Sequence, residues 1–164
     1  MIARYKQTFV RSNVVMGAYT AGDVVCNAAG DTINFGIARE LRQGKITAAK
    51  LSVTSDNTTN ATFELFFFRE NANIPALVDN AAFTMTAAAE EDLIGYTTFT
   101  SEVTGTASSQ IMWDANTILD IPFTQLESAG DLQGLYGVLT ATGAWLPDPN
   151  VTFDVTIYIE EDRV

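Results

Sequence analysis

The sequence predicts an all-β fold: a two-sheet antiparallel β-sandwich, jelly-roll-like, with one short helix. Short stretches in which apolar and polar residues alternate recur along the chain, and Gly, Asn, Asp and Pro separate them. These stretches vary in length, and a long loop over residues 70–92 interrupts them. Both features favour a two-sheet sandwich over a closed barrel.

The clearest strand is VTFDVTIYIE, residues 151–160. Every second residue from Val151 to Ile159 is apolar, so one face of this strand is expected to line the core. The same pattern, more weakly expressed, predicts the remaining strands. They are Lys6–Val10, Asp23–Cys26, Thr32–Ala38, Ile46–Thr54, Thr62–Arg69, Ile94–Thr100, Gln110–Trp113, Ile118–Phe123 and Gly134–Thr142.

One short helix is predicted at Ala87–Leu93. Thr86 is suited to cap its first turn, acidic residues follow at 90–92, and Gly95 is placed to close it. The polar run TSDNTTNAT, residues 54–62, is interpreted as a hairpin loop. Neither a linker nor a repeat divides the chain. Residues 19–164 are therefore expected to form a single β-sandwich domain, with residues 1–18 as an N-terminal arm or first strand of the same domain.

The strand FELFFF, residues 63–68, breaks the alternation. Phe63, Leu65 and Phe67 share one face, as a core strand requires, but Phe66 and Phe68 lie on the other face. Two exposed phenylalanines would forfeit several kcal/mol, at roughly 1.5–3 kcal/mol each. Either the loop 70–92 folds back over them, or a neighbouring subunit covers them, so Phe66 and Phe68 are candidates for a subunit interface.

The composition argues against catalysis. The chain of 164 residues contains no histidine and a single cysteine, Cys26, so it lacks the usual acid–base group and a second thiol for a disulfide or zinc site. Neighbouring carboxylates such as Glu90 and Glu91 cannot straddle a substrate as a glycosidase pair does. We expect no enzyme activity, no cofactor and no metal, and a carboxylate-only hydrolase is a minor alternative.

Charge is distributed unevenly around the net value of −11. Residues 1–50 hold seven basic and three acidic residues, whereas residues 51–164 hold two basic and seventeen acidic residues. The acidic part repels nucleic acid and anionic membranes, so neither is an expected partner. The basic N-terminal third is the exception.

Several motifs resemble a family that tailed bacteriophages encode near their capsid genes. The similar stretches are YTAGDVV (19–25), TINFGIAR (32–39), ITAAKLSVTS (46–55), FELFFF (63–68), VDNAAFTM (78–85), DLIGYTTF (92–99), ILDIPFTQ (118–125) and LYGVLTATGAW (135–145). The resemblance covers roughly residues 19–159. Some members of this family are cement, or decoration, proteins, which are β-sandwich trimers on the outside of the phage head.

The resemblance implies a structural virion protein made in the host cytoplasm. Such a protein would bind the outer surface of the head, stabilise it by bridging subunits of the major capsid protein, and form a homotrimer. The alternative is a carbohydrate- or receptor-binding β-sandwich module of a head fibre or tail, for which an exposed aromatic such as Trp145 would be the contact, whereas Trp113 is expected to be buried.

The N-terminal stretch ARYKQTFVRSN is the predicted capsid-binding segment. Basic and aromatic residues interleave in it, so an extended arm could pair charges and anchor two rings in another protein. The equally weighted alternative is an ordinary first strand of the sandwich with a basic outer face. The candidate contact residues are Arg4, Tyr5, Lys6, Phe9 and Arg11.

Overall fold

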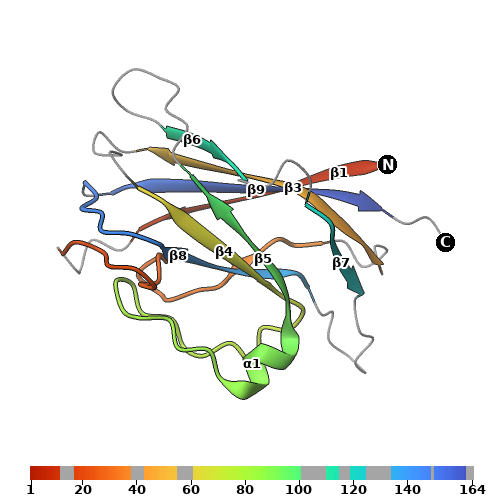
Figure 1. Cartoon of the computed structure of the whole chain (residues 1–164), viewed down its shortest axis with the longest axis horizontal. Coiled ribbons are helices and arrows are strands. Elements are labelled where there is room, and N and C mark those ends of the chain that lie inside the picture. The colour runs from red at the N-terminus through yellow and green to blue at the C-terminus, as the bar shows by residue number, and fades with distance from the viewer. Residues whose placement is uncertain are drawn as a thin grey trace.

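In the computed structural model, two antiparallel sheets pack face to face (Figure 1). The structure describes residues 1–11, 17–37, 43–54, 61–100, 110–114, 119–124, 134–148 and 150–161. Sheet I has the strand order β1-β9-β3-β6, with β7 also pairing β3, and sheet II has the order β2-β8-β4-β5. The strands are β1 (Ile2–Val10), β2 (Ile33–Asn34), β3 (Gln43–Thr54), β4 (Phe63–Phe68), β5 (Leu93–Phe99), β6 (Gln110–Trp113), β7 (Ile121–Thr124), β8 (Tyr136–Ala141) and β9 (Thr152–Glu161).

The strand order confirms the jelly roll. Apart from the short β7, the chain can be followed as one long antiparallel ribbon of successive strand pairs. From its closed end to its open end, these pairs are β4–β5, β3–β6, β2–β8 and β1–β9. Successive strand pairs lie alternately in sheet II and sheet I. A ribbon rolled in this way is the double-sheet arrangement of jelly-roll domains.

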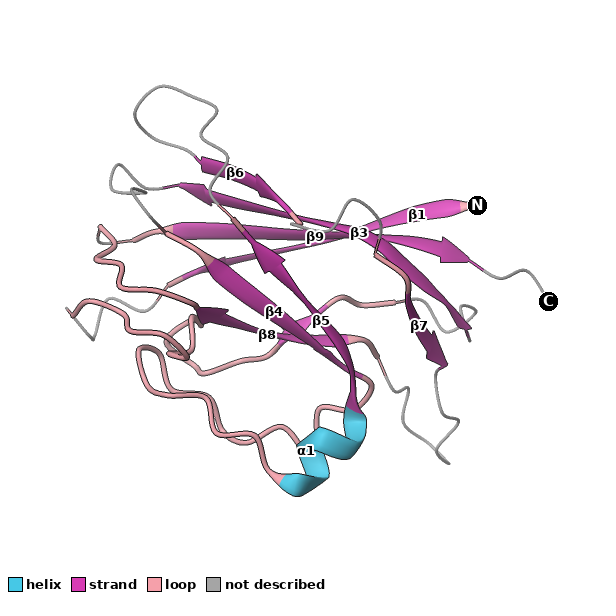
Figure 2. Ribbon diagram, viewed as in Figure 1, coloured by secondary structure: helices cyan, strands magenta, loops and turns pink. Residues whose placement is uncertain are grey.

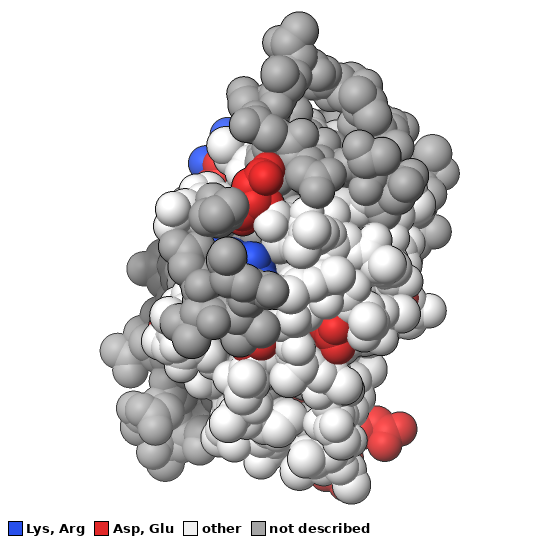
Figure 3. Space-filling model, turned by 90° about the vertical axis from the view of Figure 1, so that its left-hand side faces the viewer, with Lys and Arg blue, Asp and Glu red and all other residues white. Residues whose placement is uncertain are grey.

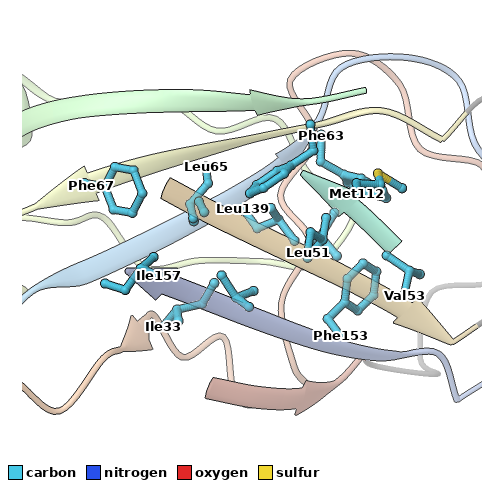
Figure 4. Close-up of a cluster of buried hydrophobic side chains, with 14 of the residues drawn as sticks. Ile33, Leu51, Val53, Phe63, Leu65, Phe67, Met112, Leu139, Phe153 and Ile157 are labelled. Carbon is cyan, nitrogen blue, oxygen red and sulfur yellow. The ribbon is translucent and has the colours of Figure 1, made fainter. Parts of the chain in front are cut away.

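The main core lies between the two sheets. Alternate residues of each strand point into it, and Figure 4 shows side chains from both sheets meeting there. Phe153 contacts Phe9 in a stacked arrangement and Phe63 edge-on, with ring centroids 5.1 and 5.8 Å apart. The largest fully buried rings include Phe63, Phe67 and Phe99. The interior is therefore filled with aromatic and aliphatic side chains, as the alternation predicts.

A second, smaller core lies on the other face of sheet II, where Phe66 and Phe68 point. Residues 70–92, here called the covering segment, lie against the outer face of sheet II and carry the helix α1 (Ala87–Asp92), as Figure 2 shows. Phe68 is fully buried there, and Phe66 contacts Phe83 at 5.8 Å between ring centroids. Leu77 and Ala89 complete the cluster from the covering segment. The chain thus covers Phe68 completely and Phe66 in part.

The boundary of helix α1 follows the predicted N-cap. Thr86 Oγ1 accepts a hydrogen bond from the Ala89 amide at 3.1 Å, so the helix begins where the sequence indicated. Gly95 does not close it: the helix ends at Asp92, Leu93 is already extended, and Gly95 lies within β5.

Two other sequence interpretations are wrong. Residues 54–62 do not join a hairpin, because β3 belongs to sheet I and β4 to sheet II; residues 55–60 themselves lie outside the described residues. Residues 23–26 do not form a regular strand and make only isolated bridges, from Asp23 to Ala82 and from Val24 to Thr140. This stretch makes backbone hydrogen bonds to β8 of sheet II and to the covering segment, and so holds the covering segment against sheet II.

Candidate functional site

The outer face of sheet I gathers most of the basic side chains in the described part of the chain. The described residues include six lysines and arginines, and four of them, Arg4, Lys6, Lys45 and Lys50, point away from the core on β1 and β3; we call this surface the basic face. Asp154 and Glu160 of β9 lie among them. Lys6 pairs with Asp154 at 2.8 Å, and Lys45 pairs with Asp120 at 3.0 Å. Acidic residues outnumber basic ones in the rest of the described chain, and the end of the molecule in Figure 3 shows scattered acidic and basic groups on a mainly uncharged surface.

The predicted N-terminal contact residues are divided between the two sides of β1. The strand alternates strictly between exposed and half-buried residues over its nine positions. Arg4 and Lys6 lie on the exposed side, whereas Tyr5 and Phe9 are half-buried and pack against the main core. Residues 2–10 pair with β9 along their whole length. Of the two alternatives for this segment, the structure has the first strand with a basic outer face.

Arg11, the last of the predicted contact residues, is buried. Its Nε donates a hydrogen bond to the Tyr19 hydroxyl at 2.6 Å and lies 3.2 Å from Asp79 Oδ2, and its guanidinium stacks over the Tyr19 ring. The Tyr19 hydroxyl donates to Asp79 Oδ1, which also accepts from the Cys26 amide. Burial, together with the Asp79 carboxylate, raises the pKa of Tyr19 above its ordinary value. This cluster joins the end of β1, residues 19–26 and the covering segment, so the role of Arg11 is structural.

The two tryptophans occupy the opposite environments to those expected. Trp145 is only 3% exposed and packs against Tyr19 and Phe63, so it cannot contact a glycan. Trp113 is 43% exposed on the basic face, because its neighbour Met112 takes the inward position of β6. The Trp113 ring stacks on Tyr158 of β9, and Lys50 Nζ lies 5.5 Å from its centroid.

A cleft of about 570 Å³ opens where the edges of the two sheets face each other. Residues 7–9 of β1 form one wall and residues 32–34, around β2, form another; the turn at 27–31 and residues 71–76 close it. The lining is mixed, with amide and hydroxyl groups as well as apolar contacts from Phe9 and Ile74. The cleft therefore lies beside the unpaired edge of β1.

Reactive chemistry is sparse in the described residues. They contain no group of three or more His, Cys, Asp or Glu side chains suited to a metal ion. Burial raises the pKa of the Cys26 thiol to about 12, which makes it a poor nucleophile. Asp92 of the acidic run 90–92 is buried rather than solvated, and it accepts a hydrogen bond from Asn73 and lies 3.5 Å from Arg69. No helix in the same residues is long and apolar enough to cross a membrane.

Comparisons with known proteins find only weak structural similarity, to structures from viruses. No family model matches the sequence, and no curated protein is similar to it. Similar solved structures include desmodium yellow mottle tymovirus (10% identity, 100% of this chain and 89% of that chain, TM-score 0.31) and turnip yellow mosaic virus (12%, 100% and 84%, 0.31). The Israel acute paralysis virus pentamer is another (9%, 98% and 88%, 0.33). At these TM-scores the fold assignment depends on the strand order and not on the superpositions.

Sequence reasoning missed part of the basic face. Lys45 and Lys50 were not singled out as contact residues and Trp113 was expected to be buried, because alternation says which side of a strand faces the core and not which strand lies beside it. The signal that was available is the pattern of β3, where both lysines occupy positions opposite in phase to Ile46 and Leu51.

Proposed function

We propose that the chain is a structural virion protein, specifically a decoration protein of a tailed-phage head, and that the basic face is its contact with the capsid. In this proposal it bridges adjacent subunits of the major capsid protein on the outer surface of the head and performs no catalysis. The family resemblance over residues 19–159 supports the role, and the jelly roll is compatible with it because virus particles use this fold widely.

The observation that carries the proposal is the separation of charge. A chain of net charge −11 places four of its six described cations on one sheet face, around the exposed Trp113. Aromatic residues and arginine, here Trp113 and Arg4, are enriched in protein contact surfaces. An acidic patch on the capsid would meet this face while the acidic remainder faces solvent. Attachment should then weaken with salt, since exposed charge pairs are screened over about 10 Å at 0.1 M.

A homotrimer is part of the proposal through the family resemblance alone. Phe68 does not support it directly, because the covering segment buries this side chain against sheet II, whereas Phe66 is only partly buried there and stays a candidate for the interface. Sedimentation velocity at micromolar concentration measures the oligomeric state of the free protein. If the free protein is a monomer, the homotrimer is refuted, but the proposed capsid contact is not.

The experiment compares two variants of equal net charge. Arg4→Gln removes one positive charge from the basic face, whereas Ala88→Glu adds one negative charge on the exposed side of helix α1, on the far side of sheet II. Both proteins have a net charge of about −12. Co-sedimentation with undecorated heads should be several-fold weaker for Arg4→Gln and unchanged for Ala88→Glu.

The outcomes separate the explanations. Equal weakening of both variants would mean that total charge, and not this face, governs attachment. Wild-type protein that does not bind heads at any salt concentration would refute the capsid role.

A further inference from the structure

Among the described residues, nothing pairs with the second edge of strand β1. In sheet I this strand pairs with β9 alone, and the bonds at its two ends define which residues face β9. The Arg11 amide donates to the Val151 carbonyl at 2.9 Å, and the Glu161 amide donates to the Met1 carbonyl at 3.0 Å. Backbone groups alternate in direction along a strand, so the odd-numbered residues face β9. The amides and carbonyls of the even-numbered residues therefore face outward; these residues are Ile2, Arg4, Lys6, Thr8 and Val10.

The same even-numbered residues carry the exposed side chains of β1. Arg4 and Lys6 thus present both their backbone groups and their charges to anything that pairs with this edge. Odd-numbered Gln7 and Phe9 point to the inner side, where they line the cleft between the two sheet edges. A strand laid against β1 would have its own side chains alternate in the same way, some beside the basic face and some in the cleft.

We propose that this edge takes up one extended segment of the capsid partner by strand addition, with acidic residues opposite Arg4 and Lys6. The residues opposite Gln7 and Phe9, apolar or amide-bearing, enter the cleft lined by Phe9, Ile33 and Asn71. Backbone hydrogen bonds supply affinity in this binding mode, and the alternating side chains supply specificity. The inference rests on the proposed function and names the structural element that performs it.

Charge selects this occupant over a second copy of the chain. Two β1 edges pair about a two-fold axis in antiparallel fashion, and the longest overlap places Lys6 opposite Lys6. Like charges directly opposite each other destabilise a pair of strands. In the described residues no ion pair involves Arg4, and an acidic segment would supply its partner. The competing explanation is that Arg4 and Lys6 only keep the edge from pairing at all.

The test blocks the edge without changing any charge. In Thr8→Pro the proline removes an outward amide and its ring obstructs an incoming strand, while the bonds to β9 are kept because Thr8 does not make them. Thr8→Ala is the matched control, since both variants lose the side-chain hydrogen bond from Thr8 to Asp154. Binding of each variant to undecorated heads is measured by co-sedimentation, and amide exchange of wild-type β1 is measured free and on heads.

We expect Thr8→Ala to bind within about twofold of wild type and Thr8→Pro at least about tenfold more weakly, since several backbone bonds of roughly 1 kcal/mol each are lost. On heads, the amides of Arg4, Lys6, Thr8 and Val10 should gain protection. Thr8→Pro that binds like wild type, or outward amides that exchange equally fast free and bound, would overturn the inference. If Thr8→Pro does not fold, wild-type exchange decides alone. If wild-type protein does not bind undecorated heads, the proposed function is refuted, and this inference with it.

Discussion

Asp79→Asn tests the buried Arg11–Tyr19–Asp79 cluster. The substitution keeps the shape of the side chain but leaves Arg11, whose side chain is 4% exposed, without a counter-charge. Removing one partner of a buried ion pair typically costs about 3–5 kcal/mol, and weakening the hydrogen bonds from Tyr19 and Cys26 adds to it. Since an asparagine can still accept one of these bonds, we expect a loss of about 3 kcal/mol. For a domain stable by roughly 5–15 kcal/mol this is a large fraction.

Equilibrium urea unfolding measures this loss. Asp31→Asn is the control, because Asp31 is an exposed carboxylate bonded to Asn27, and its loss should stay within about 0.5 kcal/mol. The double variant Arg11→Met/Asp79→Leu removes both charges together and should recover much of the stability. A loss below about 1 kcal/mol in Asp79→Asn would refute the view that this ion pair fastens the covering segment to the sandwich.

Three further predictions concern the covering segment and the smaller core beneath it. Phe83→Ala should lower the free energy of unfolding by about 2 kcal/mol and increase binding of a hydrophobic dye, whereas Val78→Ala, at a 60% exposed position, should do neither. Cys26 should resist iodoacetamide at pH 8 until urea unfolds the chain, and rapid alkylation of the native protein would contradict this prediction. Because folding raises the pKa of the thiol from 9.0 to about 12, the contribution of Cys26 to stability should be lost as the pH rises above 9. Thr86→Ala should cost about 1 kcal/mol and Thr84→Ala almost nothing, as measured by thermal unfolding.

The alternation of residues predicted much of the fold. In β9 it identified the inward face correctly, and in β4 it identified two apolar faces, of which the second turned out to lie under the covering segment. The Thr86 cap was also predictable, because capping depends on residues three apart in the chain. These features are local, so the sequence displays them directly.

The features that could not be predicted depend on long-range neighbours. Alternation does not say that β9 lies between β1 and β3, so neither the basic face nor the free edge of β1 was visible as a unit. Trp113 was expected inside because aromatic residues in a stretch such as QIMWD are commonly packed in a core, although two adjacent residues of a strand cannot both face the core, and Met112 occupies that position. Arg11 looked like a surface charge because its partners, Tyr19 and Asp79, are brought to it only by folding.

The central position of β9 also sets the order of events during synthesis. Its two neighbours, β1 and β3, both precede it in the chain and do not pair with each other, so sheet I stays split until residues 152–161 leave the ribosome. At a translation rate of about 10 residues per second, synthesis of the roughly 140 residues between Val10 and Thr152 takes about 14 s, during which β1 has no partner strand in sheet I. During that time β1 has two unpaired edges instead of one. We expect the positive charges of Arg4 and Lys6 to disfavour pairing between the β1 strands of nascent chains during that time.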